Sequence, residues 1–149
     1  MTLLRAIRDR VLSLLVRRTR SDRDAWGLRG EDAAARLLKS RGYRLLGRSL
    51  RMREGEIDLL AEDPDGRTIV VVEVKTRVRR PGQSPRSAAT PPEASITARK
   101  RRKLALLARL LARRNGWTDR PLRIDVVGVE WNAAGGDPVM RHWPGAVRA

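Results

Sequence analysis

The chain has 149 residues, the size of one ordinary domain, and is long enough to bury a real core. It contains no cysteine, which excludes a disulfide framework and any zinc site built on thiolates and suits a reducing cytoplasm. With 33 lysines and arginines against 17 acidic residues, the formal net charge is +16, so polyanions such as nucleic acids are the expected partners.

No stretch of the sequence has the features of an exported or membrane-spanning segment. The longest apolar runs fall far short of the roughly eighteen residues that cross a bilayer. No uninterrupted apolar stretch near the N-terminus precedes a small-residue cleavage site. We therefore expect a cytoplasmic protein without a transmembrane segment.

Residues 1–20 predict a basic amphipathic helix, because apolar residues recur at helical spacing with arginines between them. The apolar positions are Leu3, Leu4, Ile7, Val11, Leu14 and Leu15. We interpret the segment as an extension that packs on, or frays from, a single domain formed by residues 21–149. Docking on a membrane surface or on a protein partner is the alternative.

A second helix is expected from Asp24 to a stop at Gly42, a suitable residue for the position after a helix. Glu31 shares one stripe of this helix with apolar residues by the three-four spacing. A charged group on an apolar face is costly unless it is paired, hydrated in a cleft or bound to a metal ion. Glu31 is therefore a candidate site residue, and an ion pair with an arginine at the edge of the stripe is the alternative.

Three strands are expected next, at residues 43–50, 56–61 and 68–77, and the short links between them predict an antiparallel meander. A proline-rich loop leads to a helix that runs to about Asn115, capped either by the segment TPPE (90–93) or by Thr97. Two further strands, at 122–131 and 138–143, complete the order αβββαββ. A strand reached through a helical crossover predicts an α/β fold with one mixed central sheet flanked by helices.

Two of these strands carry charged residues although they are apolar enough to be central. In VEVKTR (72–77), alternation places Glu73 and Lys75 on one face; in GEIDLL (55–60), it places Asp58 opposite the face of Ile57 and Leu59. If the turn DPDG joins the two strands, about 4.8 Å apart, Asp58 can face Glu73 across the sheet. Neighbouring carboxylates repel each other, and a hard divalent cation such as Mg²⁺ or Mn²⁺ removes the conflict.

Lys75 would then lie beside the cation, where it could orient an attacking water or neutralise charge on a phosphate. Metal-assisted hydrolysis of a phosphodiester is the reaction that these groups fit, in a protein that already favours polyanions. A lone Glu-x-Lys in a strand is more often an exposed cross-strand ion pair. Its combination with Asp58 and Glu31 favours a catalytic site.

The segments WGLRGEDAAARLL, GEIDLL, VEVKTR and RIDVV closely resemble the YraN family of small bacterial proteins, whose members are similar to restriction-endonuclease-like nucleases of the PD-(D/E)XK superfamily. The resemblance covers roughly residues 24–130 and implies an αβββαβ nuclease core. It matches Asp58, Glu73 and Lys75 to the Asp and Glu-x-Lys elements, and Glu31 to the first-helix acid of related Holliday-junction resolvases. It implies Asp58, Glu73 and Glu31 as ligands of Mg²⁺ or Mn²⁺, and DNA or RNA as substrate. DNA is the expected substrate, and branched or structured DNA is one form of it that stays open.

Basic residues near the candidate site are expected to contact nucleic acid. Between Lys75 and Lys103 the chain has ten basic residues and one acid. Arg77 follows Lys75 on the same face and is expected to hold a phosphate, with a solvated surface arginine as the alternative. Lys100, Arg101 and Lys103 oppose the dipole at the start of the long helix, which makes sense if an anion neutralises them; phosphate contact is their expected role.

Three other features are interpreted as structural. His142 has no second histidine or cysteine nearby in the sequence and is expected to be a surface or packing residue. Asp125 is expected to satisfy an arginine such as Arg123, or a backbone group. The four tryptophans are too dispersed along the chain to predict a base-stacking platform.

Two functions therefore remain open. The first is a metal-dependent endonuclease, and the second is a non-catalytic nucleic-acid-binding protein that keeps the nuclease fold for its basic surface. Junction enzymes of this fold class often pair two sites, so a homodimer also stays open, although the sequence carries no interface signature.

Overall fold

The computed structural model describes residues 22–85 and 96–149, so the predicted N-terminal helix and the segment TPPE lie outside the described residues. The elements follow the predicted order. They are α2 (Asp22–Ser40), β1 (Arg44–Met52), β2 (Gly55–Glu62), β3 (Ile69–Arg79), α3 (Ala98–Asn115), β4 (Leu122–Asn132) and β5 (Val139–Val147). The last strand is longer than the sequence predicts, because β5 stays paired with β4 as far as the Ile124–Val147 pair.

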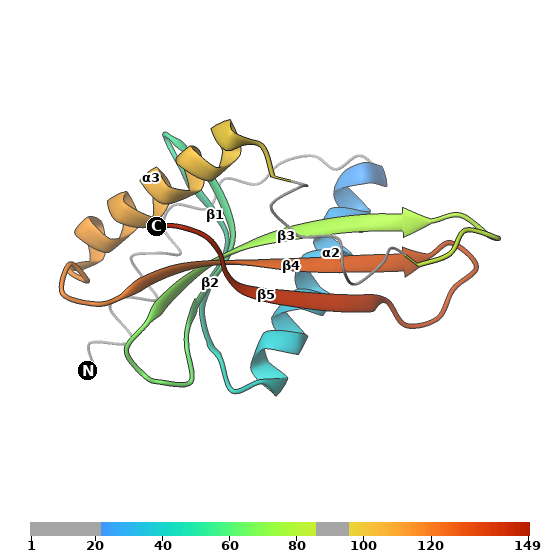
Figure 1. Ribbon diagram of the computed structural model, residues 1–149, viewed down its shortest axis with the longest axis horizontal. Helices are drawn as coiled ribbons and strands as arrows, with labels where there is room; N and C mark the ends of the chain where they lie inside the picture. The colour runs from blue at the N-terminus through green and yellow to red at the C-terminus, as the bar shows by residue number, and fades with distance from the viewer. Residues whose placement is uncertain (1–21, 86–95) are drawn as a thin grey trace.

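The five strands form one sheet in the order β1-β2-β3-β4-β5. Neighbours pair antiparallel except β3 and β4, which pair in parallel through the crossover helix α3. Figure 1 shows β3, β4 and β5 running side by side, with β1 and β2 set at a steep angle to them. This mixed α/β sheet with its two helices is consistent with the restriction-endonuclease-like core that the sequence predicts.

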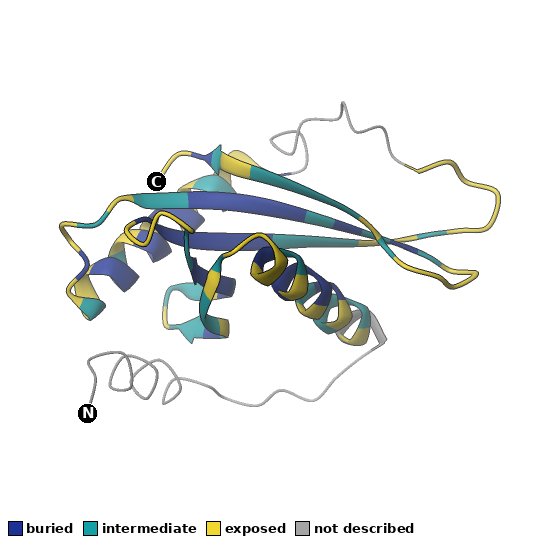
Figure 2. Ribbon diagram, turned by 90° about the horizontal axis from the view of Figure 1, so that it is seen from below, coloured by how far each residue is buried: buried dark blue, intermediate teal, exposed yellow. Residues whose placement is uncertain are grey.

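The sheet buries apolar residues on both faces. Along β3, Ile69 and Val71 pack in the cluster that contains α3, whereas Val70 and Val72 pack in the cluster that contains α2. Successive side chains of a strand point to opposite faces, so the two helices cover opposite sides of the sheet. Figure 2 shows buried residues along the middle of the sheet and on the inward side of each helix. Burial on both faces explains why β3 is a nearly continuous apolar run.

The ends of the helices have local causes that can be read in the sequence. Gly42 adopts a positive φ of 85° just after α2, a backbone conformation that glycine tolerates best. Thr97 caps α3, and its side chain accepts a hydrogen bond from the Lys100 backbone N–H at 3.1 Å. Gly116 closes the same helix in the left-handed conformation. Within the described ranges, no helix has the length and apolar character needed to cross a membrane.

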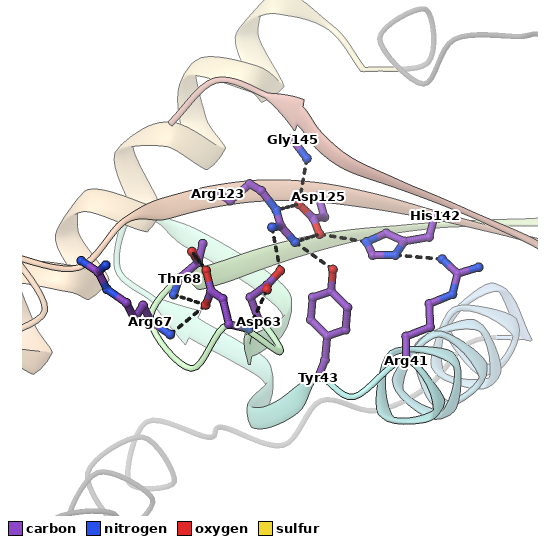
Figure 3. Close-up of polar contacts among 10 residues, drawn as sticks. Arg41, Tyr43, Asp63, Arg67, Thr68, Arg123, Asp125, His142 and Gly145 are labelled. Atoms are coloured by element: carbon purple, nitrogen blue, oxygen red, sulfur yellow. Dashed lines mark hydrogen bonds and ion pairs between the residues drawn. The ribbon is translucent and has the colours of Figure 1, made fainter.

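The buried carboxylate of Asp125 connects β4 with β5, and His142 extends the network to Arg41, the residue after α2 (Figure 3). Asp125 is fully buried and accepts hydrogen bonds from Arg123, His142 and the Gly145 backbone N–H at 2.8–3.0 Å. Burial alone would raise the pKa of Asp125, but these hydrogen bonds hold it below its usual value. Arg41 lies 3.1 Å from the other ring nitrogen of His142 and can only donate, so that nitrogen is the acceptor. The network confirms the arginine partner of Asp125 and the packing role of His142.

Candidate active site

The candidate site lies where β2 and β3 separate, a place that we call the fork. The register of the two strands ends at the Leu59–Val72 pair, whereas β3 stays paired with β4 as far as Arg79. Asp58 is the next residue of β2, and its Oδ2 accepts a hydrogen bond from the Val74 backbone N–H at 2.7 Å. A side-chain carboxylate thus takes the place of a backbone carbonyl and is held between the diverging strands.

The alternation expected for β2 fails at Asp58. Ile57 packs in the α3 cluster and Leu59 in the α2 cluster, so the prediction that they share one face is wrong. Ser49 lies between the β1 residues that pair with these two, and its φ of 46° falls in the left-handed region. The interruption of side-chain alternation in β2 therefore lies opposite a β1 residue with an irregular backbone. The Asp58 carboxylate lies in the fork beside it.

The Asp58 carboxylate is in an unfavourable environment for a negative charge. Burial is the main cause, the nearby carboxylate of Glu73 is the second, and together they raise the pKa of Asp58 to about 7. Glu31 contributes in the same direction, while the Val74 hydrogen bond and Lys100 oppose the shift. The two acids that the sequence places on neighbouring strands therefore interact electrostatically in the structure.

Glu73 is a buried carboxylate held between two lysines. Its side chain is 5% exposed, and its two oxygens lie 3.1 Å from Lys75 Nζ and 3.2 Å from Lys100 Nζ. The contact with Lys100 lacks hydrogen-bond geometry, so Glu73 Oε2 is a buried oxygen without a hydrogen bond from the described residues. Lys100 comes from the first turn of α3, which contains no acid of its own. Glu73 is thus one anion that offsets the basic start of that helix.

Glu31 approaches the fork from the face of the sheet that α2 covers, opposite the face that α3 and Lys100 cover. It lies on α2, is half-buried, and its Oε2 accepts a hydrogen bond from Ser49 Oγ at 2.8 Å. Burial raises the pKa of Glu31, and the Ser49 hydrogen bond opposes the rise. The neighbouring Arg48 forms its ion pair with Asp32. The strained residue of β1 and the candidate acid of α2 are therefore in direct contact.

Two clefts flank the fork. The first, which we call the Asp58 cleft, has a volume of about 380 Å³. Its lining residues are Trp26, Gly27, Glu31, Asp58, Val74, Lys75, Thr76 and Val78. The second, which we call the Lys103 cleft, has a volume of about 430 Å³ and is lined by Arg51, Met52, Gly55, Glu56, Lys100 and Lys103. Glu73 links them, because Lys75 from the first cleft and Lys100 from the second both contact it.

The carboxylates at the fork are oxygen ligands of the type that hard divalent cations prefer. In residues 22–85 and 96–149, no group of three or more acidic or histidine side chains converges closely enough to hold a metal ion. The structure therefore does not assemble Glu31, Asp58 and Glu73 into a closed ligand set. Asp58 and Glu73 remain a suitable pair, because Mg²⁺ is commonly held by one or two carboxylates together with substrate phosphates. The buried Oε2 of Glu73 accepts no hydrogen bond from the described residues, and Lys100 Nζ, 3.2 Å away, would have to make room for a cation there.

The basic residues predicted to bind nucleic acid fall into two groups. Lys100 and Lys103 line the Lys103 cleft, while Arg77 and Arg101 line neither cleft. Arg51 was not predicted, although it lines the same cleft as the two lysines. The sequence of β1 mixes apolar and basic residues and does not indicate a site role for Arg51. Only the pairing of β1 with β2 brings Arg51 opposite Glu56.

The tryptophans are also less dispersed in space than in the sequence. The rings of Trp26 and Trp131 lie 5.9 Å apart, and Trp26 lines the Asp58 cleft. Dispersal along the chain therefore does not keep this pair apart, and the prediction that the tryptophans form no base-stacking platform stays a prediction. Part of this arrangement could be read in the sequence, because Trp26 and Arg29 are three residues apart on the helix that carries Glu31, a spacing that predicts contact between their side chains.

Comparison with known proteins places the chain in a family. It is 50% identical over 105 residues to a UPF0102 protein of Symbiobacterium thermophilum, an alignment that covers 70% of this chain and 80% of that protein. It is 42% identical over 125 residues to a UPF0102 protein of Leifsonia xyli subsp. xyli, with coverages of 84% and 98%. Among solved structures, Pyrococcus furiosus SfsA in complex with Ca²⁺ shares 18% identity and a TM-score of 0.31 over 80% of this chain and 63% of that one, a likeness too weak to carry an argument. The model of "Uncharacterised protein family UPF0102" matches residues 30–129, and the chain therefore belongs to this family, which is the YraN family that its motifs indicate.

Proposed function

We propose that this protein is a metal-dependent nuclease that hydrolyses phosphodiester bonds in DNA, with branched or structured DNA as the expected substrate. The observation that carries the proposal is the meeting of Asp58 and Glu73 at the fork, where burial and mutual repulsion raise the pKa of Asp58 to about 7. Two carboxylates this close repel each other at a cost in stability, and a bound dication would offset that repulsion. The net charge of +16 favours a polyanionic substrate.

The roles of the residues follow from their positions. Asp58 and Glu73 would hold the cation, and Glu31 would accept a hydrogen bond from one of its waters in the Asp58 cleft. A bound Mg²⁺ supplies Lewis acidity that activates a water nucleophile and offsets charge on the phosphate. Lys75, 38% exposed, would orient the attacking water or neutralise charge that develops on the phosphate. Lys100 and Lys103 would contact neighbouring phosphates from the Lys103 cleft.

The direct test is a cleavage assay with Mg²⁺ or Mn²⁺ on duplex, flapped, four-way-junction and single-stranded DNA. We expect cleavage of at least one substrate, and a loss of at least about 100-fold for Asp58→Asn, Glu73→Gln and Lys75→Met, because each removes a group that contacts the reacting phosphate or its cation. Asp137→Asn is the matched control, since Asp137 is an exposed acid and lines neither cleft. The proposal fails if no substrate is cut, or if Asp58→Asn cuts as fast as the parent.

One observation favours a second candidate, a nucleic-acid-binding protein without catalysis. The charge of Glu73 is already balanced by Lys75 and Lys100, as expected if the role of these three residues is to form structural ion pairs. That candidate predicts DNA binding that weakens steeply with salt but is unchanged by metal ions and by Asp58→Asn. Titration with Mn²⁺ under binding conditions separates the two functions.

A further inference from the structure

The Asp58 cleft has an apolar wall beside its charged groups. Trp26 and Val78 line it together with Glu31, Asp58 and Lys75. Val78 is 39% exposed, so part of its side chain is accessible to a ligand in the cleft. An apolar surface next to polar groups inside one cleft is typical of a ligand subsite.

The indole of Trp26 is held by contacts with two side chains outside the lining of the cleft. The Arg29 guanidinium lies 4.5 Å from the centre of the Trp26 ring and 4.7 Å from that of Trp131. The two tryptophan rings lie 5.9 Å apart at 51° to each other. Trp131 is 7% exposed and belongs to the core under α2. These contacts anchor Trp26 to the sheet, so its ring can offer a fixed surface to a ligand at low entropic cost.

We infer that this wall is a stacking subsite for an unpaired nucleobase, with Trp26 and Val78 contacting the base while the adjoining phosphate lies at Asp58 and Lys75. The inference rests on the proposed function, because it takes the occupant of the cleft to be a nucleic acid strand. The cleft volume of about 380 Å³ falls in the range of about 300–1,000 Å³ for small-ligand pockets. Every base has a flat aromatic face, so such a subsite is tolerant of sequence.

The subsite has a consequence for the substrate. A base inside a duplex is stacked on both faces and cannot reach an aromatic wall unless it leaves the helix. A nucleotide in a single strand, a flap or the branch of a junction is already unstacked. The protein is therefore specific for an unpaired nucleotide next to the phosphate at the fork.

Binding measurements test this without relying on cleavage. In an Asp58→Asn background, fluorescence anisotropy compares a single-stranded 12-mer with a duplex of the same sequence. Trp26→Ala weakens single-strand binding by about 5-fold to 100-fold, the effect expected for loss of one stacked base, and changes duplex binding by less than about 2-fold. Trp26→Phe retains most of the affinity because it keeps an aromatic face.

Val78→Ser and Val139→Ser form a matched pair of controls. Both valines are 39% exposed and both lie on strands, but only Val78 lines the cleft. Val78→Ser weakens single-strand binding and Val139→Ser does not. An abasic nucleotide is also placed at each position of the 12-mer in turn. At one position it lowers the affinity of the parent as much as Trp26→Ala does, and at that position it lowers the affinity of Trp26→Ala no further.

Three results would overturn the inference: equal losses on single-stranded and duplex DNA, no loss in Trp26→Ala, or a change in tryptophan emission, present in the parent and absent in Trp26→Phe, that follows deletion of residues 1–20 and not addition of DNA. The last result would mean that the chain's own N-terminal segment covers the wall. Failure of the proposed function is distinguishable from these. If the parent cuts DNA and Trp26→Ala binds single strands as tightly as the Asp58→Asn background does, the nuclease proposal stands and the subsite is refuted. If no DNA is cut but Trp26→Ala weakens single-strand binding, the subsite stands without the nuclease.

Discussion

At the scale of single residues, Asp58 is costly to the fold. Its pKa is about 7 in the folded protein and about 3.9 in an unfolded chain. Between these values the folded state binds a proton that the unfolded state has released. The free energy of unfolding therefore falls as the pH rises from about 4 to about 7, and it stays at the lower value in alkali.

Asp58→Asn should consequently stabilise the protein at pH 8 in the absence of divalent cations. The amide oxygen can still accept the Val74 hydrogen bond, while the buried charge is gone. We expect the free energy of unfolding to rise by on the order of 1–3 kcal/mol at pH 8 and by little at pH 4. Urea denaturation at several pH values measures the difference.

Divalent cations should reverse the comparison. If the parent binds Mn²⁺ at the fork, added Mn²⁺ raises its midpoint of unfolding and leaves that of Asp58→Asn nearly unchanged. Asp137→Asn, the exposed control, should behave as the parent does with and without the cation. Equal stability of parent and Asp58→Asn at pH 8 would contradict the electrostatic account of this residue.

The sequence predicted which residues meet at the fork better than it predicted their partners. Asp58 and Glu73 could be identified because a short turn sets the register of the two adjacent strands, although the side-chain alternation expected for β2 fails at Asp58. Lys100 was identified as a cation, but its contact with Glu73 depends on where α3 crosses the sheet. Residues that meet only through tertiary packing have no local pattern to indicate it.

At the scale of elements, the approach of α2 to β3 sets the geometry of the Asp58 cleft. Gly30 is buried against Thr76, and a Cβ added at Gly30 would overlap Thr76 Oγ1 and come within 3.0 Å of Thr76 Cβ. A glycine is needed at this position because of close packing and not because of backbone conformation. Glu31 follows it directly, so the same contact positions a candidate site residue.

Gly30→Ala should therefore separate α2 from β3. Overpacking of this kind costs about 1–3 kcal/mol in the free energy of unfolding. We expect the variant to show that loss in thermal or urea denaturation and a reduced DNA cleavage rate, because Glu31 moves with the helix. Thr76→Ala, which removes the overlapping atoms, should restore most of the stability in the double variant.

Gly27→Ala is the matched control on the same helix. A Cβ at Gly27 has nothing within 4 Å, so the substitution adds helix propensity without a clash. It should be neutral or stabilising by up to about 1 kcal/mol. Similar losses for the two glycine variants would show that the contact with Thr76 is unimportant.

The elements themselves could be predicted from apolar periodicity, and the exception has a local cause. The spacing of apolar residues indicates α2, α3 and each strand, because burial imposes a period on every element. The strand alternation fails at Ser49 and Asp58, where a serine adopts a left-handed conformation that composition does not signal. This irregularity lies beside the fork that holds the candidate acid, and backbone strain is often found at functional sites.

At the scale of the whole molecule, the net charge of +16 can be counted directly from the sequence, but the sequence does not show where on the surface the charges lie. Many acids are consumed in ion pairs with arginines, such as Glu62 with Arg44 and Arg120. Lys103 and Arg101 lie on the part of α3 next to the fork, while Lys39 lies in the last turn of α2. The total charge gives attraction to DNA, and the position of each cation decides whether it contacts a phosphate.

Salt dependence distinguishes cations that contact phosphates from those that contribute only to the overall charge. The double variant Arg101→Gln/Lys103→Gln should reduce the slope of log affinity against log salt concentration by about 2, because each lost phosphate contact removes about one unit. Lys103 would make its contact from the Lys103 cleft and Arg101 from the neighbouring surface of α3, outside both clefts. Lys39→Gln/Arg113→Gln removes the same charge from the last turns of α2 and α3 and should change the slope by less than about 0.5. Lys100 is left intact in both, because its contact with Glu73 would confound binding with stability. If the two double variants shift the slope equally, DNA binds by diffuse attraction over the whole surface, and the Lys103 cleft has no special part in it.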